Sequence, residues 1–350
     1  MDNTPCLGGS AAGKSKVTEG QAAILALDGG NSKTDVALIR TDGAVLASVR
    51  GGGINSQEAG AEPTVHALDD LVRQVVHAGG EIPVLHTVAC LANADLPEEE
   101  EELAAAVLAA GWSQTSTVIN DTFAILRSGL RDDEPHWGVA VVCGAGINAV
   151  GVAPDGRVTR FLALGQLTGD WGGGYGLGRE VMWHAIRAED GRGPATALTE
   201  CVRDFFNMDK VEDVAIAIHK EKIEDGDLNG LAPVLLRASA DGDPVARGIV
   251  DQLADEISIL ALTAMRRLGL TGLATPVVLG GGVITAGDTI LLTGIADRIV
   301  TGAPDAEIRV IDVPPVVGAA LLALDHIQAP PAAEARLRAT LRRSTDPVAS

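Results

Sequence analysis

The chain has 350 residues, roughly twice the usual size of a single domain, so we expect two lobes. Hydrophobic residues make up 46% and charged residues 21%, which excludes a disordered chain. The 47 acidic and 27 basic residues give a formal charge of −20, which repels phosphate backbones and anionic lipid. Only 3% of the residues are aromatic, too few for a surface that stacks single strands, so we expect no nucleic-acid partner.

The cysteines and the apolar segments bear on cofactors and location. Cys6, Cys90, Cys143 and Cys201 form no CxxC pair, and no histidines stand at zinc-ligand spacing. The longest apolar stretches are too short or too charged to span a bilayer, and the start lacks a basic segment followed by an apolar one. We expect a cytoplasmic protein with no membrane contact, disulfide scaffold or structural zinc.

Residues 1–22 are rich in Gly, Ser, Ala and Lys without periodicity, and we expect a flexible extension there. This segment matches the pattern of a nucleotide P-loop at Gly8, Gly13, Lys14 and Ser15. A P-loop works only when a buried strand precedes it and a helix follows it, and the residues before Gly8 are no such strand. We interpret the match as coincidental.

Two stretches of the chain share one pattern, in which an apolar run meets a glycine turn and continues as a hairpin. In the first, residues 24–27 lead through a polar turn at 28–34 into 36–39, and a turn at 41–43 leads into 45–49. The second runs from 139–142 through 144–146 to 149–153, then turns at 154–156 into 158–161. The repetition predicts two similar lobes, each opening with a strand, a glycine turn and a hairpin.

Helices and strands alternate through the rest of the chain, which predicts an α/β fold. Pro97 with Glu98 to Glu102 indicates a capped helix start facing solvent. We expect helices over 56–76, 173–188, 194–206, 231–240, 244–268, 289–300 and 315–327, and strands over 84–91, 117–119, 276–279 and 308–311. The predicted parts are a lobe of residues 23–119 completed by the helix at 315–328, a lobe of residues 120–314, and a loose tail at 329–350.

Four predicted strands end in an aspartate or a glycine-rich loop: at Asp28, at Asn120-Asp121, at Gly144–Gly146 and at Gly280–Gly282. In open α/β sheets such ends line the crevice where ligands bind. Glycine lets backbone amides approach an anion closely, and successive amides form a phosphate nest. Two such turns, one from each lobe, would hold a polyphosphate from both sides.

Two aspartates in this set could carry chemistry. Asp28 ends a strand and is followed by several side chains that donate hydrogen bonds. This context favours a carboxylate that holds hydrated Mg²⁺ over one that only caps the turn. Asp121 closes a strand and could be a helix N-cap. In a cleft it could instead accept the proton of a hydroxyl that attacks a γ-phosphate.

A dinucleotide site is a competing interpretation, because Gly144-x-Gly146-x-x-Ala149 follows a predicted strand. That fingerprint must open a helix, whereas Pro154-Asp155-Gly156 turns the chain too soon for one, and the expected acid about 20 residues on is missing. We therefore disfavour a dinucleotide site.

The order of motifs resembles the BadF/BadG-type ATPase family of the actin/hexokinase-like superfamily, and its N-acetylglucosamine kinase branch in particular. The matching residues are Leu27-Asp28-Gly29-Gly30-x-Ser32-Lys33-Thr34, Asn120-Asp121-Thr122-x-Ala124, Gly169-Asp170-x-Gly172-x-Gly174 and Leu279-Gly280-Gly281-Gly282-Val283. The resemblance spans about residues 24–327. It implies an α/β, two-lobed actin/hexokinase-like (ribonuclease H-like) fold with a ligand cleft between the lobes.

The resemblance also implies roles for particular residues. Asp121 falls at the position of the general base, and Asp28 lies near the Mg²⁺, which it would hold through water. The residues implied for ATP are Asp28, Gly29, Gly30, Asn31, Ser32, Lys33, Thr34, Gly144, Ala145, Gly146, Gly280, Gly281 and Gly282. Those implied for the sugar are Asn55, Asn93, Asp95, Asp121, Asp170 and Gly174, although Asn93 could equally be a turn former.

The chain departs from the family pattern at two positions. Ala145 stands where a hydroxyl residue is usual between the glycines of the second phosphate loop, and Trp171 stands where Glu often follows the Gly-Asp turn. Trp171 could stack on a sugar or pack in the core. Dehydratase activators of the same family hold an iron–sulfur cluster through cysteines, and the scattered cysteines here give that interpretation no ligands.

The resemblance leads us to expect ATP- and Mg²⁺-dependent phosphorylation of the 6-hydroxyl of N-acetylglucosamine by a cytoplasmic homodimer. Glucosamine or N-acetylmannosamine are alternative acceptors. A non-enzymatic ATP-dependent sensor of the same fold is the alternative outside enzymes.

Overall fold

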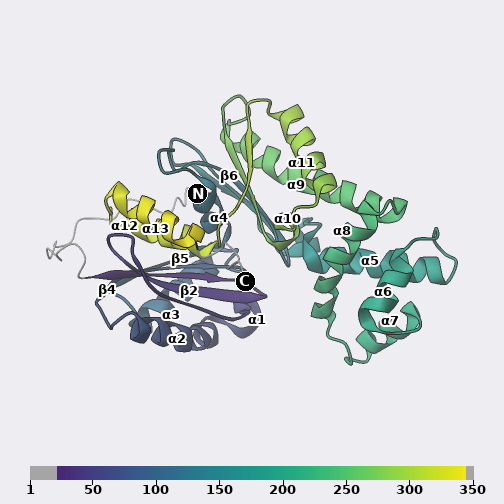
Figure 1. The fold of residues 1–350 in the computed structure, drawn as a ribbon, viewed down its shortest axis with the longest axis horizontal. Helices are drawn as coiled ribbons and strands as arrows, with labels where there is room; N and C mark the ends of the chain where they lie inside the picture. Colours follow the sequence, from purple (N-terminus) through teal and green to yellow (C-terminus); the bar gives the residue numbers. More distant parts are fainter. Residues whose placement is uncertain (1–21, 344–350) are drawn as a thin grey trace. The chain divides into compact units, whose positions relative to one another are not determined.

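The computed structural model describes residues 22–343, and these form two compact units (Figure 1). Unit 1 contains the described residues up to 138, residues 150–162 and those from 311 onward. Unit 2 contains residues 139–149 and 163–310. The predicted N-terminal extension and the P-loop-like match at Gly8, Gly13, Lys14 and Ser15 lie outside the described residues. No helix within residues 22–343 is long and apolar enough to cross a membrane.

Unit 1 is built on a five-stranded sheet with the order β3-β2-β1-β4-β5. The first three strands form an antiparallel meander, and β4 and β5 add in parallel to β1. The bounds are β1 Ala23–Gly29, β2 Lys33–Arg40, β3 Val45–Gly52, β4 Val84–Leu91 and β5 Thr115–Asn120. This is the predicted meander, with the expected strands at 84–91 and 117–119 in place.

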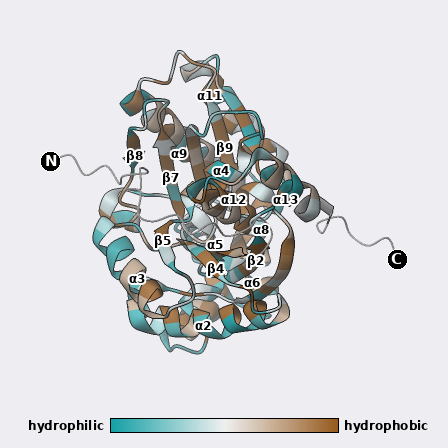
Figure 2. Cartoon of the chain, turned by 90° about the vertical axis from the view of Figure 1, so that its left-hand side faces the viewer, coloured by the Kyte–Doolittle hydropathy of each residue, from teal (hydrophilic) through white to brown (hydrophobic). Residues whose placement is uncertain are grey.

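Helices cover both faces of this sheet. Successive side chains of β1 point to opposite faces, so they pack alternately into two different hydrophobic cores. Leu25 and Leu27 face α2 (Ala61–Ala78) and α3 (Pro97–Ala109), whereas Ile24 and Ala26 face α12 (Val316–His326). Figure 2 shows hydrophobic and hydrophilic segments alternating along α2, as its amphipathic pattern requires. In contrast, α12 has apolar residues on nearly all of its faces, which matches its position buried in the core.

The second sheet has the order β10-β9-β6-β7-β8. Its strands are β6 Gly138–Cys143, β7 Ile147–Val152, β8 Val158–Arg160, β9 Pro276–Gly280 and β10 Glu307–Val310. β9 pairs in parallel with β6 and β10, whereas β7 and β8 form an antiparallel hairpin. The strand, glycine turn and hairpin therefore do occur twice in the fold.

Unit 2 is otherwise helical. α5 (Gly173–Glu189) packs against α6 (Leu198–Phe206), α7 (Val211–His219) and α8 (Ala232–Ala240). α9 (Pro244–Leu268) packs on α8 and on α11 (Thr289–Gly302), and α10 (Gly282–Thr285) follows β9. α9 begins where Asp243 accepts a hydrogen bond from the Ala246 amide, with Pro244 in its first turn.

Two helix boundaries differ from the prediction, and one further helix was not predicted. The helix expected over 56–76 is broken at Gly60, whose φ of 84° separates α1 (Ser56–Ala59) from α2. The helix expected from residue 194 begins only at Leu198. α7 has no counterpart in the prediction.

The structure also divides the chain differently from the predicted lobes. α4 (Thr122–Gly129) belongs to unit 1 and not to the lobe expected from residue 120, because it packs against α12. Gly318 permits this contact because it has no side chain: a Cβ there would lie 1.9 Å from the carbonyl oxygen of Ala124.

The C-terminal tail, which was expected to be loose, instead forms helix α13 (Pro331–Arg343). This helix buries Ala333 and Leu337 in the unit 1 core.

Candidate functional site

The first glycine turn connects β1 to β2 in unit 1. The Gly30 amide donates a hydrogen bond to the Lys33 carbonyl (2.9 Å), and the side chains of Asn31, Ser32 and Lys33 are exposed at the tip. Neighbouring segments hold the base of the turn: the Ile54 amide donates to the Gly30 carbonyl (3.0 Å) and the Ala92 amide to the Gly29 carbonyl (2.8 Å). The turn is therefore fixed from two sides, while its polar tip faces solvent.

A second glycine loop packs directly on this turn. At Gly53, after β3, a Cβ would lie 1.9 Å from the backbone oxygen of Asn31. At Gly52 a Cβ would meet nothing within 4 Å. Only the glycine at position 53 is thus required for the close approach of the two backbones.

Asp28 lies at the end of β1 and is only 8% exposed. Burial, and then the nearby Asp121 and Asp35 carboxylates, raise the pKa of Asp28 to about 8. Asp35 is its direct partner on β2, and Asp35 in turn accepts two hydrogen bonds from Arg50 on β3 (2.6 and 2.9 Å). Sequence reasoning missed Asp35 and Arg50, although the position of Asp35 opposite Asp28 follows from the hairpin register.

Asp121 stands between β5 and α4. No side-chain capping bond from Asp121 opens the helix; instead the Asn120 side chain accepts from the Thr122 amide (3.1 Å) and the Thr122 hydroxyl (2.6 Å). Burial raises the pKa of Asp121 to about 6. Since Asp121 is the largest charged contributor to the raised pKa of Asp28, the two carboxylates lie within electrostatic reach of each other.

Three asparagine side chains meet beside the first turn. The Asn93 amide nitrogen donates to the Asn31 oxygen (2.6 Å) and to the Asn55 oxygen (3.1 Å). Asn93 also has a left-handed φ of 62°, so it is a turn former and a polar contact at once. The structure thus joins a residue predicted for ATP to two residues predicted for the sugar.

Asp95 continues this polar surface. It is 8% exposed and accepts hydrogen bonds from Asn120 Nδ2 (2.9 Å) and Gln57 Nε2 (3.4 Å). The Glu99 carboxylate fixes the backbone here by accepting from the amides of Asp95 (2.9 Å) and Leu96 (3.0 Å), which is the expected helix cap.

The neighbouring Glu100 departs from the predicted solvated helix start. It accepts from the Asn120 amide (2.8 Å) and from both terminal nitrogens of Arg160 (2.7 and 2.8 Å). Arg160 comes from β8, and it also donates to the Ala94 carbonyl (3.2 Å). The pair of Arg160 and Glu100 braces Asn120 and the segment before Asp95. Sequence reasoning missed this pair because its two residues lie 60 positions apart in the chain.

A small cavity of about 170 Å³ adjoins the asparagine cluster. Its polar lining comes from Ser56, Gln57, Asn93, Glu99 and Glu102, and Gly60, Ala61 and Leu103 complete the wall. The cavity has room for a small substituent and carries two carboxylates.

In unit 2 the second glycine turn, Gly144–Gly146, is held against the start of α5. The carbonyls of Gly144 and Ala145 accept from the amides of Gly174 (2.7 Å) and Tyr175 (3.1 Å). At Gly173 (φ 71°) a Cβ would lie 2.5 Å from the Ala145 oxygen, and at Gly281 (φ 92°) one would lie 2.4 Å from the Cys143 carbonyl carbon. Three glycine segments, 144–146, 172–174 and 280–282, therefore pack together.

The Gly-Asp turn of unit 2 is also ordered by local contacts. The Thr168 hydroxyl donates to the Asp170 carboxylate, and the Trp171 indole donates to Glu180 (3.4 Å). Burial first, and then Asp255 and Asp170, raise the pKa of Glu256 on α9. Glu256 is thus a further acid close to Asp170 that the sequence did not single out.

The predicted residues fall into two groups, one in each unit. Unit 1 brings together the first turn, the acids and the asparagines: Asp28, Gly29, Gly30, Asn31, Ser32, Lys33, Thr34, Asn55, Asn93, Asp95 and Asp121. Unit 2 contains Gly144, Ala145, Gly146, Asp170, Gly174, Gly280, Gly281 and Gly282. Of the first group, Thr34 is fully buried, so its side chain does not reach the surface.

The acids of unit 1 have the donor chemistry that Mg²⁺ requires. Asp28, Asp35 and Asp121 supply hard carboxylate oxygens, and only Asp35 has a bidentate cationic partner. A divalent cation beside Asp28 would relieve the repulsion that now raises its pKa. In contrast, the buried thiols do not suit a metal: burial raises the pKa of Cys143 to about 12, and Cys90 is also buried.

Comparisons with known proteins show which proteins the whole chain resembles. The chain is 26% identical over 318 residues to the N-acetyl-D-glucosamine kinase of Dictyostelium discoideum, covering 86% of this chain and 98% of that protein. It is also 26% identical over 263 residues to the N-acetylmuramic acid/N-acetylglucosamine kinase of Clostridium acetobutylicum, covering 75% and 85%.

The fold resembles the crystal structure of a candidate N-acetylglucosamine kinase from Chromobacterium violaceum, with a TM-score of 0.67 and 23% identity, covering 86% of this chain and 98% of that one. The expected α/β fold of the actin/hexokinase-like class is thereby confirmed. The model of the BadF/BadG/BcrA/BcrD ATPase family matches residues 25–323. As the motifs predicted, the chain therefore belongs to the BadF/BadG/BcrA/BcrD ATPase family.

Proposed function

We propose that this protein is an ATP-dependent sugar kinase that transfers the γ-phosphoryl group of ATP to the 6-hydroxyl of N-acetylglucosamine. Family membership supports the use of ATP. Two relatives that act on N-acetylglucosamine, each 26% identical to this chain, support the acceptor. The proposal includes the expected cytoplasmic location and homodimer, and light scattering on the purified protein tests the dimer.

The observation that carries the proposal is the position of Asp121 beside the Asp28 turn. A half-buried carboxylate with a pKa of about 6 is ionised at neutral pH and still basic enough to accept a hydroxyl proton. In our proposal it takes the proton of the 6-hydroxyl while that oxygen attacks the γ-phosphorus. The P–O bond to ADP breaks as the new one forms.

The remaining residues position the two substrates. The amides of the turn at Gly29–Thr34 would hold phosphate oxygens, as would those at Gly144–Gly146, and Lys33 adds a cation. Asp28 would hold Mg²⁺ through water, and the bound ion would neutralise charge on the phosphates. Gly280–Gly282 would lie beside the adenosine.

On the acceptor side, sugar hydroxyls both donate and accept hydrogen bonds, which suits Asn and Asp side chains. We assign the sugar to Asn55, Asn93, Asp95 and Asp121, with Asp170 and the Gly174 backbone from unit 2. The cavity beside Asn93 would receive a substituent of the ring. Its carboxylates at Glu99 and Glu102 favour a neutral acetamido group over the anionic lactyl group of N-acetylmuramic acid.

The test is a coupled assay of ADP release with a panel of acceptors: N-acetylglucosamine, glucosamine, N-acetylmannosamine, N-acetylmuramic acid and glucose. We expect ADP release to depend on the sugar and to be fastest with N-acetylglucosamine. A faster rate with another amino sugar would reassign the acceptor. Slow hydrolysis that no sugar accelerates would instead favour the sensor.

A further inference from the structure

Helix α13 lies beyond the residues that the family model matches, which end at 323. It is nevertheless anchored in unit 1 by more than its apolar residues. Arg338, in the middle of α13, is only 5% exposed, and long cationic side chains are seldom buried without dedicated partners. The partners of Arg338 therefore indicate what α13 does.

Arg338 binds the C-terminal end of helix α4. Its guanidinium donates to the backbone oxygens of Leu130 (2.6 Å), Ser128 (2.9 Å) and Arg127 (3.3 Å). The last carbonyls of a helix have no partner within the helix, and a cation there also opposes the negative end of the helix dipole. Arg338 thus caps α4 from a segment more than 200 residues away in the chain.

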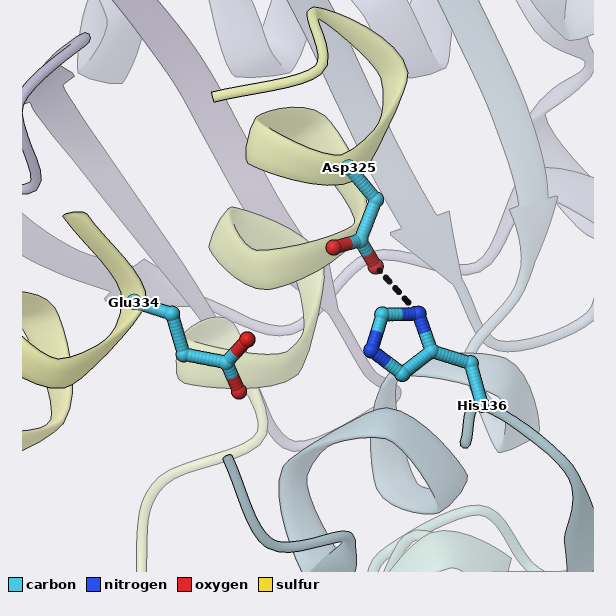
Figure 3. A group of neighbouring side chains, drawn as sticks. All are labelled: His136, Asp325 and Glu334. Atoms are coloured by element: carbon cyan, nitrogen blue, oxygen red, sulfur yellow. Dashed lines mark ion pairs between the residues drawn. The ribbon is translucent and has the colours of Figure 1, made fainter. Parts of the chain in front are cut away.

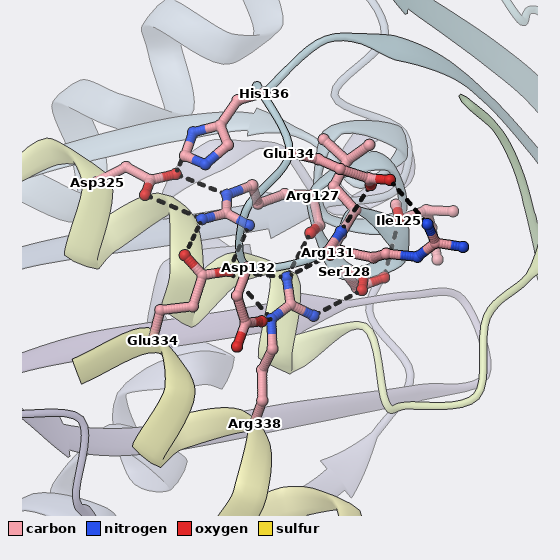
Figure 4. A network of polar contacts seen from close by, with 11 residues as sticks. Ile125, Arg127, Ser128, Arg131, Asp132, Glu134, His136, Asp325, Glu334 and Arg338 are labelled. Carbon is pink, nitrogen blue, oxygen red and sulfur yellow. Dashed lines mark hydrogen bonds and ion pairs between the residues drawn. The ribbon is translucent and has the colours of Figure 1, made fainter. Parts of the chain in front are cut away.

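A second arginine ties the same end of α4 to both C-terminal helices (Figure 4). Arg127 of α4 is 2% exposed and binds Asp325 of α12 through Nε (2.8 Å) and Nη2 (3.2 Å). It also binds Glu334 of α13 through Nη1 (2.9 Å) and Nη2 (2.6 Å). Glu334 accepts from Arg338 as well (3.0 Å), so the two arginines share one carboxylate.

A metal centre is the alternative interpretation of this region, because His136, Asp325 and Glu334 converge (Figure 3). Their potential ligand atoms all lie within 4.8 Å of one another. However, the Arg127 guanidinium already binds both carboxylates in bidentate fashion, and its permanent charge would repel a second cation. The two carboxylates of the cluster therefore serve to bind the Arg127 guanidinium and not a metal ion.

The other end of α4 carries Asp121. The helix has eight residues, so about 12 Å of rigid helix separate the anchored end from the aspartate. Near the end that carries Asp121, α4 packs closely against α12, where Gly318 approaches the Ala124 backbone with no side chain between them. A short helix held near both of its ends has little freedom to tilt, whereas one released at its C-terminal end can fray there or pivot about the remaining contact.

We propose that Arg338 of helix α13 is a positioning residue that holds α4, and through it Asp121, in place for proton transfer. The proposal rests on the role proposed for Asp121. It assigns to the C-terminal helix a part in turnover, beyond its contribution to the core.

The first test compares Arg338→Ala with Arg336→Ala in steady-state kinetics. Arg336 lies on the same helix, but its side chain pairs with Asp42 at the surface (2.7 Å) and does not touch α4. A displacement of about 1 Å at a reacting group can cost on the order of 100-fold in rate. We expect Arg338→Ala to lower kcat by about 10-fold or more, with KM for ATP and sugar within about 2-fold of wild type.

The matched Arg336→Ala should keep wild-type kcat, and Arg338→Lys, which retains the charge, should recover part of the loss. Wild-type kcat in Arg338→Ala would overturn the positioning role while leaving the proposed kinase intact. A loss confined to KM would also overturn it.

A double-mutant cycle separates action through Asp121 from general damage. If Arg338 acts through Asp121, then Arg338→Ala should reduce kcat far less in an Asp121→Asn background than in the wild type. An equal reduction in both backgrounds would contradict the proposal.

Hydrogen exchange of the α4 amides provides a readout that does not depend on activity. We expect faster exchange over residues 122–129 in Arg338→Ala than in Arg336→Ala, with α2 unchanged. If Arg338→Ala does not fold, Glu334→Gln replaces it, because this change weakens the hold on both arginines and preserves the shape. Unchanged exchange of α4 in the folded variant would overturn the proposal.

Discussion

Asp28 is buried and Asp121 is half-buried, and the pKa values of both acids are raised, to about 8 and about 6 respectively. Desolvation is the largest cause in each case, and the charge of Asp121 acts on Asp28. Burial of Asp28 near the charge of Asp121 lowers the stability of the ligand-free fold. A bound cation would relieve the repulsion between the two carboxylates, so the same arrangement favours ligand binding.

The first prediction concerns Asp121 as the base. Asp121→Asn keeps the shape of the side chain but removes the proton acceptor, so kcat should fall by about 100-fold or more. In the wild type, kcat/KM for the sugar should fall as the pH drops through about 6, because protonated Asp121 cannot accept a proton. Steady-state kinetics from pH 5 to 9 test both points. If kcat/KM of the Asp121→Asn variant still fell below pH 6 as it does in the wild type, the base would be another residue.

The second prediction concerns the stability of the ligand-free protein. The pKa of Asp28 is raised from 3.8 to about 8 in the folded state, so the fold binds a proton that the unfolded chain releases. Asp28 therefore makes stability decline as the pH rises from about 4 to about 8. Asp28→Asn should flatten this decline and raise Tm at pH 8, relative to wild type, by several degrees. Scanning calorimetry without Mg²⁺ measures it, and a variant with the wild-type pH slope would refute the assignment.

At the scale of elements, the turn at Gly29–Thr34, which we propose binds phosphate, is shaped by the close approach of the glycine loop after β3. Gly53→Ala should push the Asn31 backbone away and raise KM for ATP by about 10-fold, since a shift of about 1 Å can cost that much or more. Gly52→Ala is the matched control, because a Cβ there meets nothing within 4 Å. Equal KM values for ATP in the two variants would show that the turn does not depend on this contact.

The hairpin that ends in β8 braces the proposed sugar site through Arg160 and Glu100. Arg160→Met should leave Glu100 half-buried without its cation and loosen Asn120 and Asp95. We expect KM for the sugar to rise by about 10-fold, as loss of a charged hydrogen bond predicts, with KM for ATP unchanged. Arg157→Met, which breaks an exposed pair with Asp155 on the same hairpin, is the control. A rise in KM for the sugar that is equal in both variants would contradict the bracing role.

Periodicity predicted most of these elements, and its failures have physical causes. The helical pattern over 56–76 does not reveal that Gly60 adopts a positive φ and divides the helix. Pro330 and Pro331 suggested a loose tail, yet Pro331 opens α13, where a proline is well tolerated. The five consecutive glutamates gave no sign that Glu100 meets an arginine 60 residues away.

At the scale of the whole molecule, the repeated strand and glycine turn predicted two similar sheets, and the order of the motifs predicted the family. It could not predict the division of the chain, because α4 follows β5 in sequence but packs on α12 from near the C-terminus. The candidate site shows the same limit. Its aspartates and glycines follow from strand ends, whereas Asp35 and Arg50 become visible only when β1, β2 and β3 are paired. Arg160 becomes visible only when β8 meets the start of α3.

The most direct test of the account is the product formed from ATP and N-acetylglucosamine, followed by phosphorus–proton correlation NMR, in wild-type protein and in Asp121→Asn. We predict a phosphate coupled to the protons on carbon 6 of the sugar in the wild type, and at least about 100-fold slower formation in the variant. Wild-type protein that consumes ATP without forming a sugar phosphate, or equal rates in both proteins, would contradict the account.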